Sequence, residues 1–362
     1  MTPRVLVVGG GLTSAVTSCL LREELQSRCQ LAIWDKARGA GGRLSTSRGP
    51  EGCGNADLGA QYVTVSPHYQ QRHQRFYSEL TGAGVLAPLS AIVQGLRVLA
   101  PLSATVQGLR PSPAGTRHLV ASDGSSALVR HFLRRATAEP EFGQHVTEVS
   151  PGDSTVSVVT AAGRQEAFDV VVLTMPTPQI LGLGGSLLKG SDADEDSVVA
   201  GLRGVEYSSR YALGLFFDKP GAVDVPWGAT YVSDHPVIRY VAVDNVKRGK
   251  DTAPTSVVVH TSVAFGVEHV EKTPDQVQPI LLRHVTELFP DWPVPVTIKC
   301  QKWRFSQVVT PYPGSPGHVV LCRRPLVVAA GDAFTHSNVD GCIESAESTA
   351  QGVIQYVKSL HS

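Results

Sequence analysis

Two glycine-rich turns near the start of the chain combine the residue types that hold a diphosphate. Gly9 and Gly11 follow the apolar run RVLVV, which predicts a buried strand, and residues 13–25 carry apolar side chains at helical spacing. Glycine allows a tight turn and a close approach of the backbone, and the free N–H groups at the start of a helix face a bound anion. Gly42 and Arg43 form a second turn, in which a fixed cation can neutralise a second phosphate.

The first turn matches a dinucleotide-binding βαβ unit with one departure from the pattern. Ser14 stands at the third position of G-x-G-x-x-G, where glycine permits the closest packing of helix against strand. Asp35 ends the next apolar run, LAIWD, and is placed to accept hydrogen bonds from an adenosine ribose. This order of elements predicts a bound dinucleotide, and the second turn favours FAD because a simple nicotinamide dehydrogenase needs no second phosphate clamp. The alternative is an α/β turn without a ligand.

A second constellation of this kind lies near the C-terminus. Asp332 ends the apolar run PLVVAAGD, and ligands of open α/β sheets bind at the carboxyl ends of the strands. An acceptor there suits the hydroxyls of a ribityl chain. We expect a helix from about Cys342 to Lys358, so the N–H groups of Gly341, Cys342 and Ile343 would stabilise the electron-rich edge of a reduced flavin ring.

Four further residues fit an FAD site. Gln61 and Tyr62 follow a predicted turn at Gly59 and are able to line a planar ring. Thr174 lies at the polar corner that ends the strand-like run at 168–176, and Val146, in an alternating run at 143–149, can bond adenine through its backbone. Each position is also compatible with a plain turn or strand end.

The composition bounds the class of protein. At 362 residues the chain is long enough for two domains. Lys and Arg together number 32, as do Asp and Glu, so no net positive field attracts nucleic acid. The six cysteines lack C-x-x-C spacing, which indicates reduced thiols, and the scattered histidines predict no metal site. No run reaches the roughly 18–20 apolar residues that span a bilayer.

These features predict a cytoplasmic protein that binds neither a membrane nor nucleic acid, with a secreted protein as the alternative. Residues 3–21 could be mistaken for a secretory leader, but its removal would delete the first strand and the phosphate turn. The oligomeric state is not indicated by the sequence.

Two groups of strand-like runs predict two domains. Runs near 4–8, 170–175 and 325–332 are apolar and end in turns, as parallel buried strands do. Runs at 211–217, 238–244 and 256–263 alternate and predict a largely antiparallel sheet. We expect an α/β (α+β) fold in which residues 1–66, 120–180 and 299–362 form a Rossmann-like FAD-binding domain. The substrate domain would be discontinuous as well, comprising residues 67–119 and 181–298.

A tandem repeat interrupts the expected substrate domain. VLAPLSAIVQGLR at 85–97 is followed by VLAPLSATVQGLR at 98–110, and the copies differ only at Ile92 and Thr105. Two copies are too few for a solenoid. We interpret the repeat as a recent duplication, with one copy packed and the other extruded as a loop, although an error of sequence assembly would look the same.

Segments along nearly the whole chain resemble the renalase family, flavoproteins related to the flavin amine oxidases. The segments that carry the resemblance include LAIWDK, GGR, ADLGAQYVTVSPHY, YSSRYALGLFF, KCQKWRFSQV and GDAFTHSNVDGCIESA. The resemblance implies a fold like that of p-hydroxybenzoate hydroxylase and the amine oxidases, and non-covalent FAD. It also implies that Thr13, Arg43, Gln61 and Tyr62 contact the cofactor.

The resemblance further implies an activity. Members of this family oxidise isomers of NAD(P)H reduced at ring carbons 2 or 6 to NAD(P)+, and O2 is reduced to hydrogen peroxide. The expected partners are therefore a small dinucleotide substrate and O2. Two alternatives stay open: an amine oxidase, with Lys302 as the lysine near the flavin, or a secreted signalling protein with a structural flavin.

The sequence leaves the catalytic residues unknown and offers candidates for substrate contact. Planar rings can stack on a dihydronicotinamide, and Arg210 and Arg239 are candidate phosphate partners. For each ring, packing in the core is the competing explanation. The candidates for substrate contact besides Tyr62 are Tyr211, Trp227, Tyr240 and Asn245.

Overall fold

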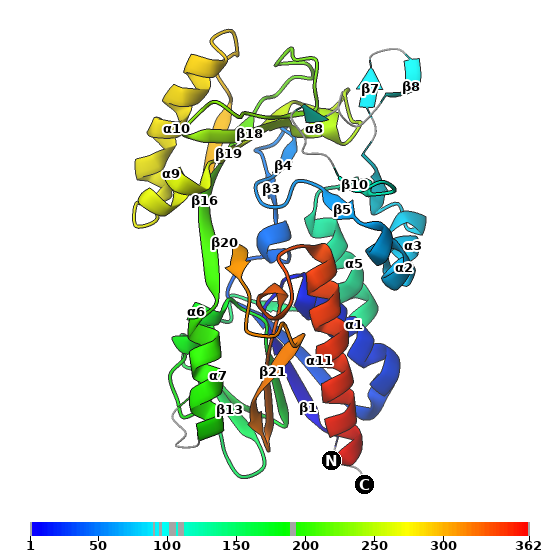
Figure 1. Ribbon diagram of the computed structural model, residues 1–362, viewed down its shortest axis with the longest axis vertical. Helices are drawn as coiled ribbons and strands as arrows, with labels where there is room; N and C mark the ends of the chain where they lie inside the picture. The colour runs from blue at the N-terminus through cyan, green and yellow to red at the C-terminus, as the bar shows by residue number, and fades with distance from the viewer. Residues whose placement is uncertain are drawn as a thin grey trace. The chain divides into compact units, whose positions relative to one another are not determined.

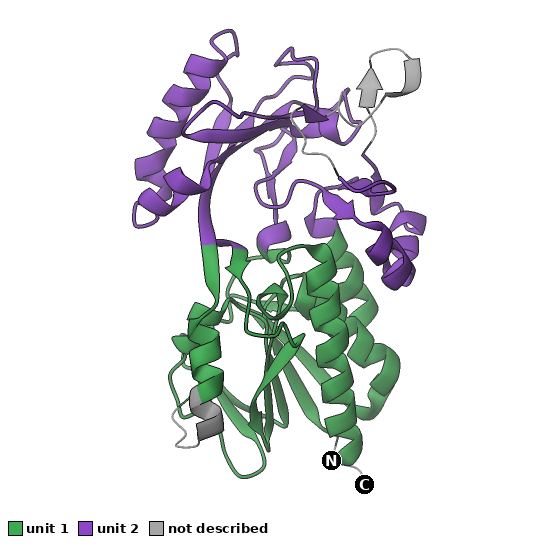
Figure 2. Ribbon diagram, in the orientation of Figure 1, with its two compact units in different colours: residues 1–42, 128–207, 308–362 green, residues 43–127, 208–307 purple. Residues whose placement is uncertain are grey.

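The computed structural model of the chain describes residues 2–89, 91–93, 96–100, 106–107, 112–188 and 193–360. The chain forms two compact units, shown in different colours in Figure 2. Unit 1 comprises residues 1–42, 128–207 and 308–362, and unit 2 comprises residues 43–127 and 208–307.

Unit 1 is built mainly of parallel strands and long helices (Figure 1). Its strands are β1 (Arg4–Val8), β2 (Gln30–Asp35), β11 (Glu141–Phe142), β12 (Val146–Pro151), β13 (Val156–Thr160), β14 (Gln165–Phe168), β15 (Val170–Leu173), β21 (His318–Arg323) and β22 (Leu326–Ala330). Its helices are α1 (Leu12–Leu25), α6 (Thr177–Leu181), α7 (Ala193–Arg203), α11 (Val339–Ser359) and the 3-10 turns η1 (Gln26–Arg28) and η3 (Asp332–Phe334), and it contains most of α5 (Ser126–Ala136).

The main sheet of unit 1 confirms the predicted Rossmann-like fold. Its strand order is β11-β2-β1-β15-β22-β21, and β1 runs parallel to both β2 and β15. β22 continues the parallel series and β21 closes it as an antiparallel edge. Helices α1 and α11 lie side by side (Figure 1). Ser14 is fully buried in α1, so the hydroxymethyl group is accommodated where the glycine pattern is broken.

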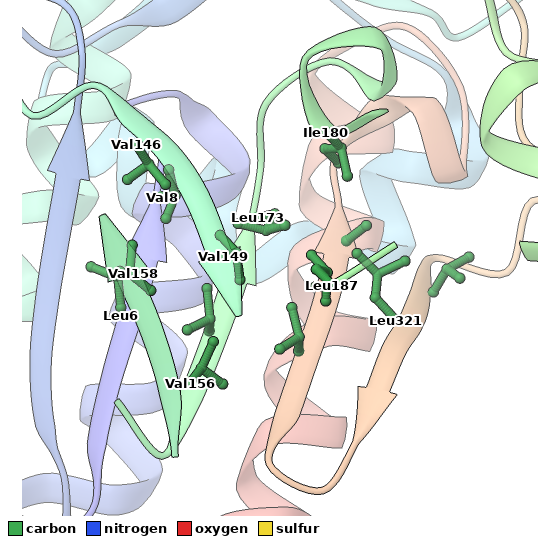
Figure 3. Packing of buried hydrophobic residues seen from close by; sticks show 14 of the residues in the cluster. Leu6, Val8, Val146, Val149, Val156, Val158, Leu173, Ile180, Leu187 and Leu321 are labelled. Carbon is green, nitrogen blue, oxygen red and sulfur yellow. The ribbon is translucent and has the colours of Figure 1, made fainter. Parts of the chain in front are cut away.

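An apolar core fixes the strand ends of unit 1. Figure 3 shows Leu6 and Val8 of β1 and Leu173 of β15 packed near valines of the β12–β13 hairpin, among them Val146 and Val158. Burying one such side chain contributes about 1.5–3 kcal/mol. The cluster therefore holds β1 and β15 in place below the turns that follow them.

Unit 2 contains the predicted, largely antiparallel sheet. Its strands are β3 (Thr46–Arg48), β4 (Asn55–Asp57), β5 (Val63–Val65), β6 (Leu86–Pro88), β7 (Ala91–Val93), β8 (Leu96–Ala100), β9 (Val106–Gln107), β10 (Arg117–Ala121), β17 (Ala229–Tyr231), β18 (Ile238–Val243) and β19 (Ser256–Thr261), with most of β16 (Glu206–Phe216) and β20 (Thr297–Thr310). Its helices are α2 (Pro67–Arg72), α3 (Gln74–Gly82), α8 (Asp244–Lys247), α9 (Val263–Glu268) and α10 (Pro274–Leu288), and η2 (Gly42–Leu44) begins at the unit boundary.

The largest sheet of unit 2 has the order β20-β16-β19-β18-β17-β9. β19 pairs antiparallel with β16 and β18, and β18 pairs antiparallel with β17. Helix α10 packs Val277, Leu281 and Val285 into the core beside this sheet. A capping box at Thr273 and Gln276 starts that helix and satisfies its first N–H groups.

The unit boundaries differ from the expected domain boundaries at four places. Residues 43–66, 120–127 and 299–307 lie in unit 2, whereas the sequence assigned them to the cofactor domain, and residues 181–207 lie in unit 1. Helix α7 explains one difference, since Val198 and Leu202 pack into the core of unit 1. Boundaries of this kind depend on packing, which the runs of strand-like sequence do not specify.

The tandem repeat is not divided into a packed copy and an extruded copy, as far as the described residues show. β6 of the first copy pairs with β10, and β9 of the second copy pairs with β17. Between them β7 and β8 pair with each other across the junction of the copies. The first copy thus contributes β6, and the second copy β9, to two different sheets of unit 2. Thr105 lies outside the described residues.

Candidate functional site

The first glycine turn of unit 1 is tied to the end of β15. Gly9 has a φ of +123°, and a Cβ atom there would lie 2.2 Å from Oγ1 of Thr174. Thr174 in turn donates that hydroxyl to the carbonyl of Val8 at 2.8 Å. The structure therefore brings two predicted cofactor positions together, and only glycine fits at residue 9.

The second glycine turn lies on the first. The N–H of Gly41 donates to the carbonyl of Gly10 at 2.8 Å, and a Cβ on Gly42 would lie 3.4 Å from Cα of Gly11. A Cβ on Gly11 itself would meet no atom of the described chain within 4 Å. Packing within the protein does not require glycine at residue 11, so the bare backbone there fits the close approach of a diphosphate.

Asp35 holds the glycine turn in addition to any role toward a ribose. Its Oδ2 accepts a hydrogen bond from the N–H of Gly10, and its Oδ1 accepts one from Ala37 at 2.5 Å. The N–H of Gln144 donates to the carbonyl of Asp35 at 2.9 Å. The segment that leads to Val146 therefore lies beside the end of β2, where the adenosine was predicted.

The start of α11 differs from the predicted helix start. The helix begins at Val339, because the side chain of Asn338 caps it by accepting from the N–H of Gly341 at 2.8 Å. The N–H of Cys342 donates to the carbonyl of Asn338 at 3.2 Å. These two N–H groups serve the helix itself, and Ile343 is buried in the core. Gly341 and Cys342 thus direct these N–H groups to Asn338, and contact of residues 341–343 with a flavin stays a prediction.

The same segment nevertheless adjoins the glycine turn. Oγ1 of Thr13 lies 3.5 Å from the carbonyl oxygen of Cys342, and Gly341 has to be glycine because a Cβ would lie 1.9 Å from the carbonyl oxygen of His336. Asp332 is buried at the end of β22, and its Oδ2 accepts from Ser337 at 2.9 Å. Unit 1 thus gathers its predicted cofactor residues at the carboxyl ends of β1, β15 and β22.

In unit 2, Gln61 is fixed by the protein. Its Nε2 donates to the carbonyls of Asp57 and Gly59, and its Oε1 accepts from Nζ of Lys247 at 2.9 Å. Arg43 also lies in unit 2, where its carbonyl accepts from the N–H of Ala60 at 3.0 Å. Contact of Gln61 and Arg43 with FAD stays a prediction, and the amide of Gln61 has little hydrogen-bonding capacity to spare for it.

A row of rings crosses three strands of unit 2. The register of the sheet pairs Tyr231 of β17 with Tyr240 of β18, and Tyr240 with His260 of β19. The ring centroids lie 5.0 Å apart in the first pair and 5.8 Å apart in the second. Tyr62 joins the row through its hydroxyl, which lies 2.7 Å from that of Tyr231. We call these four residues the aromatic row.

The environment keeps every member of the aromatic row that shows a pKa shift uncharged. Loss of solvation, assisted by the positive charges of Arg210 and Lys247, lowers the pKa of His260 to about 3. Burial and the neighbouring Tyr231 raise the pKa of Tyr62, and burial raises the pKa of Tyr240 well above its usual value. The hydroxyls of Tyr62 and Tyr240 therefore stay protonated and the imidazole of His260 stays neutral near pH 7.

Two arginines, Arg210 and Arg239, lie beside the aromatic row. Arg210 donates to the carbonyl of Thr261 at 3.2 Å and to the side-chain oxygen of Gln307 at 3.4 Å. Arg239 donates to the carbonyl of Val232 at 3.0 Å, and its guanidinium lies 5.8 Å from the centroid of the Tyr231 ring. Within the described part of the chain, neither guanidinium has a carboxylate within 4.0 Å.

The charge of Arg239 acts on Arg210. Burial and, after it, the positive charge of Arg239 lower the pKa of the Arg210 guanidinium. Two cations that repel each other, with no carboxylate beside them among the described residues, favour binding of an anion.

Of the predicted substrate residues, only Tyr62 and Tyr240 belong to the aromatic row. Tyr211 is buried in the core and donates its hydroxyl to the carbonyls of His269 and Lys272, at 2.8 and 2.6 Å. Trp227 packs near Phe289, with ring centroids 6.2 Å apart. Asn245 accepts from the N–H of Ser256 at 3.2 Å. In the structure, Tyr211 and Trp227 therefore pack in the core, and Asn245 holds the backbone of Ser256 by a hydrogen bond.

Lys302, the lysine considered for an amine oxidase, uses its ammonium group to bond two backbone carbonyls of unit 2. Its Nζ donates to the carbonyls of Val270 and Lys272, both at 3.0 Å.

Sequence reasoning missed Tyr231 and His260, whose positions in the aromatic row follow only from the strand register.

Comparisons with known proteins identify the family to which the chain belongs. Residues 68–354 match the family of flavin-containing amine oxidoreductases, and residues 7–80 match an NAD(P)-binding Rossmann-like domain. The chain therefore belongs to the flavin-containing amine oxidoreductases and is a flavoprotein with FAD as its cofactor.

Within that class the chain is related to the renalases. It is 39% identical to the renalase of Mus musculus over 359 residues, which cover 98% of this chain and 99% of the mouse protein. This relationship confirms the resemblance seen in the sequence.

Solved structures support the fold at low sequence identity. A putative protoporphyrinogen oxidase from Exiguobacterium sp. 255-15 superposes with a TM-score of 0.69 at 14% identity, covering 98% of this chain and 99% of that one. Cyclohexylamine oxidase from Brevibacterium oxydans IH-35A gives a TM-score of 0.68 at 12% identity, covering 99% of this chain and all of that one.

Among the described helices, none combines the length and apolar character needed to cross a bilayer.

Proposed function

We propose that this flavin-dependent oxidoreductase oxidises 2- and 6-dihydro isomers of NAD(P)H to NAD(P)+ with O2 as the acceptor. Membership of the flavin-containing amine oxidoreductases and the relationship to mouse renalase support flavin-dependent oxidation. The observation that favours a dinucleotide over an amine is the pair of arginines beside the aromatic row, which have no carboxylate within 4.0 Å in the described part of the chain.

The charges of the site discriminate between the two substrate classes. A primary amine is a cation near pH 7 and would be repelled by Arg210 and Arg239, with no carboxylate near them in the described part of the chain. A dinucleotide carries phosphates that guanidinium groups bind well and a planar ring that aromatic side chains can contact. The site therefore suits an anionic, planar substrate.

The residues of unit 2 would bind and orient the substrate without exchanging protons with it. When bound, FAD would supply the hydride-accepting chemistry: the substrate would be oxidised to NAD(P)+, and O2 would be reduced to hydrogen peroxide with two electrons and two protons. Since His260 is neutral and Tyr62 is protonated, the hydrogen-bonded hydroxyl pair of Tyr62 and Tyr231 can donate one further hydrogen bond, to a carboxamide oxygen. Because His260 is not in its cationic form near pH 7, it cannot act as an imidazolium acid toward the substrate.

Product analysis tests the proposal. Holoenzyme in air is supplied with 6-dihydro-NAD and, separately, with cyclohexylamine. We expect NAD+ and hydrogen peroxide in equal amounts from the first and no peroxide from the second. Peroxide formed from the amine alone would overturn the proposal in favour of an amine oxidase.

A further inference from the structure

Unit 2 contains a buried network of four charged side chains that the proposed reaction does not use. Asp57, Asp244, Lys247 and Arg248 all have side chains at most 3% exposed. Arg248 pairs with Asp57 at 2.7 Å and also with Asp244, and Lys247 pairs with Asp244. The two positive and two negative charges balance, as burial of charge requires.

The network joins β4 to α8. The N–H of Asp57 donates to Oδ2 of Asp244 at 3.0 Å, and the N–H of Ser125 donates to Oδ1 of Asp57 at 2.9 Å. The cations Arg248 and Lys247 together lower the pKa of Asp244. Asp244 is therefore ionised, and the ammonium of Lys247 is held in one place.

One hydrogen bond leaves this network toward the aromatic row. Nζ of Lys247 donates to Oε1 of Gln61 at 2.9 Å, while Nε2 of Gln61 donates to the carbonyls of Asp57 and Gly59. Rotating the amide by half a turn would set its NH2 group against the ammonium. Lys247 thus fixes which edge of the amide faces which partner.

The fixed amide adjoins two members of the aromatic row. His260 Nε2 lies 3.4 Å from Nε2 of Gln61 and 3.2 Å from the carbonyl oxygen of Leu58, within the same turn, and Tyr62 is the next residue of the chain. We propose that Lys247 is a positioning residue: through Gln61 it sets the turn at residues 58–62 and hence the placement of Tyr62 and His260. The substrate that this placement serves rests on the proposed function.

The competing explanation is that Lys247 only neutralises Asp244. Removing the ammonium alone would leave a buried carboxylate with one partner fewer and would destabilise the protein in either case. The variant Asp244→Asn/Lys247→Met removes one charge of each sign and keeps the network neutral. Lys250→Met is the matched control, because Lys250 is exposed and pairs with Asp123 on the surface.

The first test follows the amide itself and needs no substrate. Holoprotein is labelled with 15N-glutamine, and the side-chain signals missing from Gln61→Leu identify Gln61. In the variant Asp244→Asn/Lys247→Met we expect these signals to shift. Their protons should exchange with water about tenfold faster or more, because the amide loses its hydrogen bond from the charged Lys247. Unchanged signals would overturn the proposal, whether or not the proposed substrate is correct.

A double-mutant cycle on activity gives the second test. In the chain that keeps Gln61, the paired substitution is expected to lower kcat/KM for 6-dihydro-NAD by about tenfold, and in the Gln61→Leu background by less than about twofold. Equal losses in both backgrounds would show that the effect of Lys247 does not pass through Gln61 and would overturn the proposal. Thermal unfolding of each variant confirms folding, and lack of activity in the unmodified enzyme would count against the substrate and not against Lys247.

Discussion

At the scale of single residues, the proposed function assigns the choice of substrate to Arg210 and Arg239. Replacing Arg210 with Met should raise KM for a dihydro-NAD(P) isomer by about tenfold, since a charge-assisted contact with a phosphate is lost. Steady-state kinetics measures the effect, and salt should weaken binding to the unmodified enzyme. Arg304→Met is the control, because Arg304 is an arginine of unit 2 that already pairs with Glu271 at 2.8 Å. An equal rise in KM for both variants would remove Arg210 from the site.

His260 should make folding sensitive to acid. Its pKa is lowered to about 3 in the folded protein from an ordinary value near 6.5. Between these values the unfolded chain binds the proton and the folded chain does not, so the free energy of unfolding falls as pH drops from about 6.5 toward 3. Urea unfolding at several pH values measures this slope, and His260→Asn should make it shallower. A slope unchanged by the substitution would show that His260 is not held neutral.

At the scale of elements, the two glycines of the turn between β1 and α1 have different roles: Gly9 is needed for folding and Gly11 for cofactor binding. Gly9→Ala places a Cβ against Thr174 at a positive φ, so we expect a loss of about 1–3 kcal/mol in stability together with loss of FAD. Gly11 has a φ of −94°, and a Cβ added there would meet no atom of the described residues beyond its chain neighbours within 4 Å. Gly11→Ala should therefore leave the flavin-free protein as stable as before and weaken FAD binding. Thermal unfolding and flavin titration measure the two effects, and normal FAD affinity in Gly11→Ala would contradict the diphosphate site.

The elements also show what the sequence could and could not predict. The apolar runs at β1, β15 and β22 end where cofactor residues were expected, because the position of a strand end is a local property. The start of α11 was missed by three residues, since it depends on the side chain of Asn338. Tyr231 and His260 were missed for a different reason: their alignment with Tyr240 is set by pairing between strands far apart in the chain.

At the scale of the whole molecule, the tandem repeat places the β7–β8 hairpin between β6 and β9. The VQGLR that ends the second copy, which contains β9, also ends the first copy, so deleting residues 93–105 joins β6 to an unchanged β9. Loop length has only a small effect on stability, so the shortened chain should unfold within a few °C of the full chain and keep its flavin. Differential scanning calorimetry and flavin absorbance test this. Loss of flavin would show that the 13-residue insertion supports the fold.

The most direct test of the substrate assignment is anaerobic reduction of the bound flavin. Stopped-flow absorbance would compare 2- and 6-dihydro-NAD(P), ordinary 4-dihydro-NAD(P)H and cyclohexylamine at equal concentrations. The arrangement of Arg210, Arg239 and the aromatic row predicts rapid loss of flavin absorbance with the 2- or 6-dihydro isomers and none with the amine. Bleaching by the amine, with no response to any dihydronicotinamide, would contradict the account.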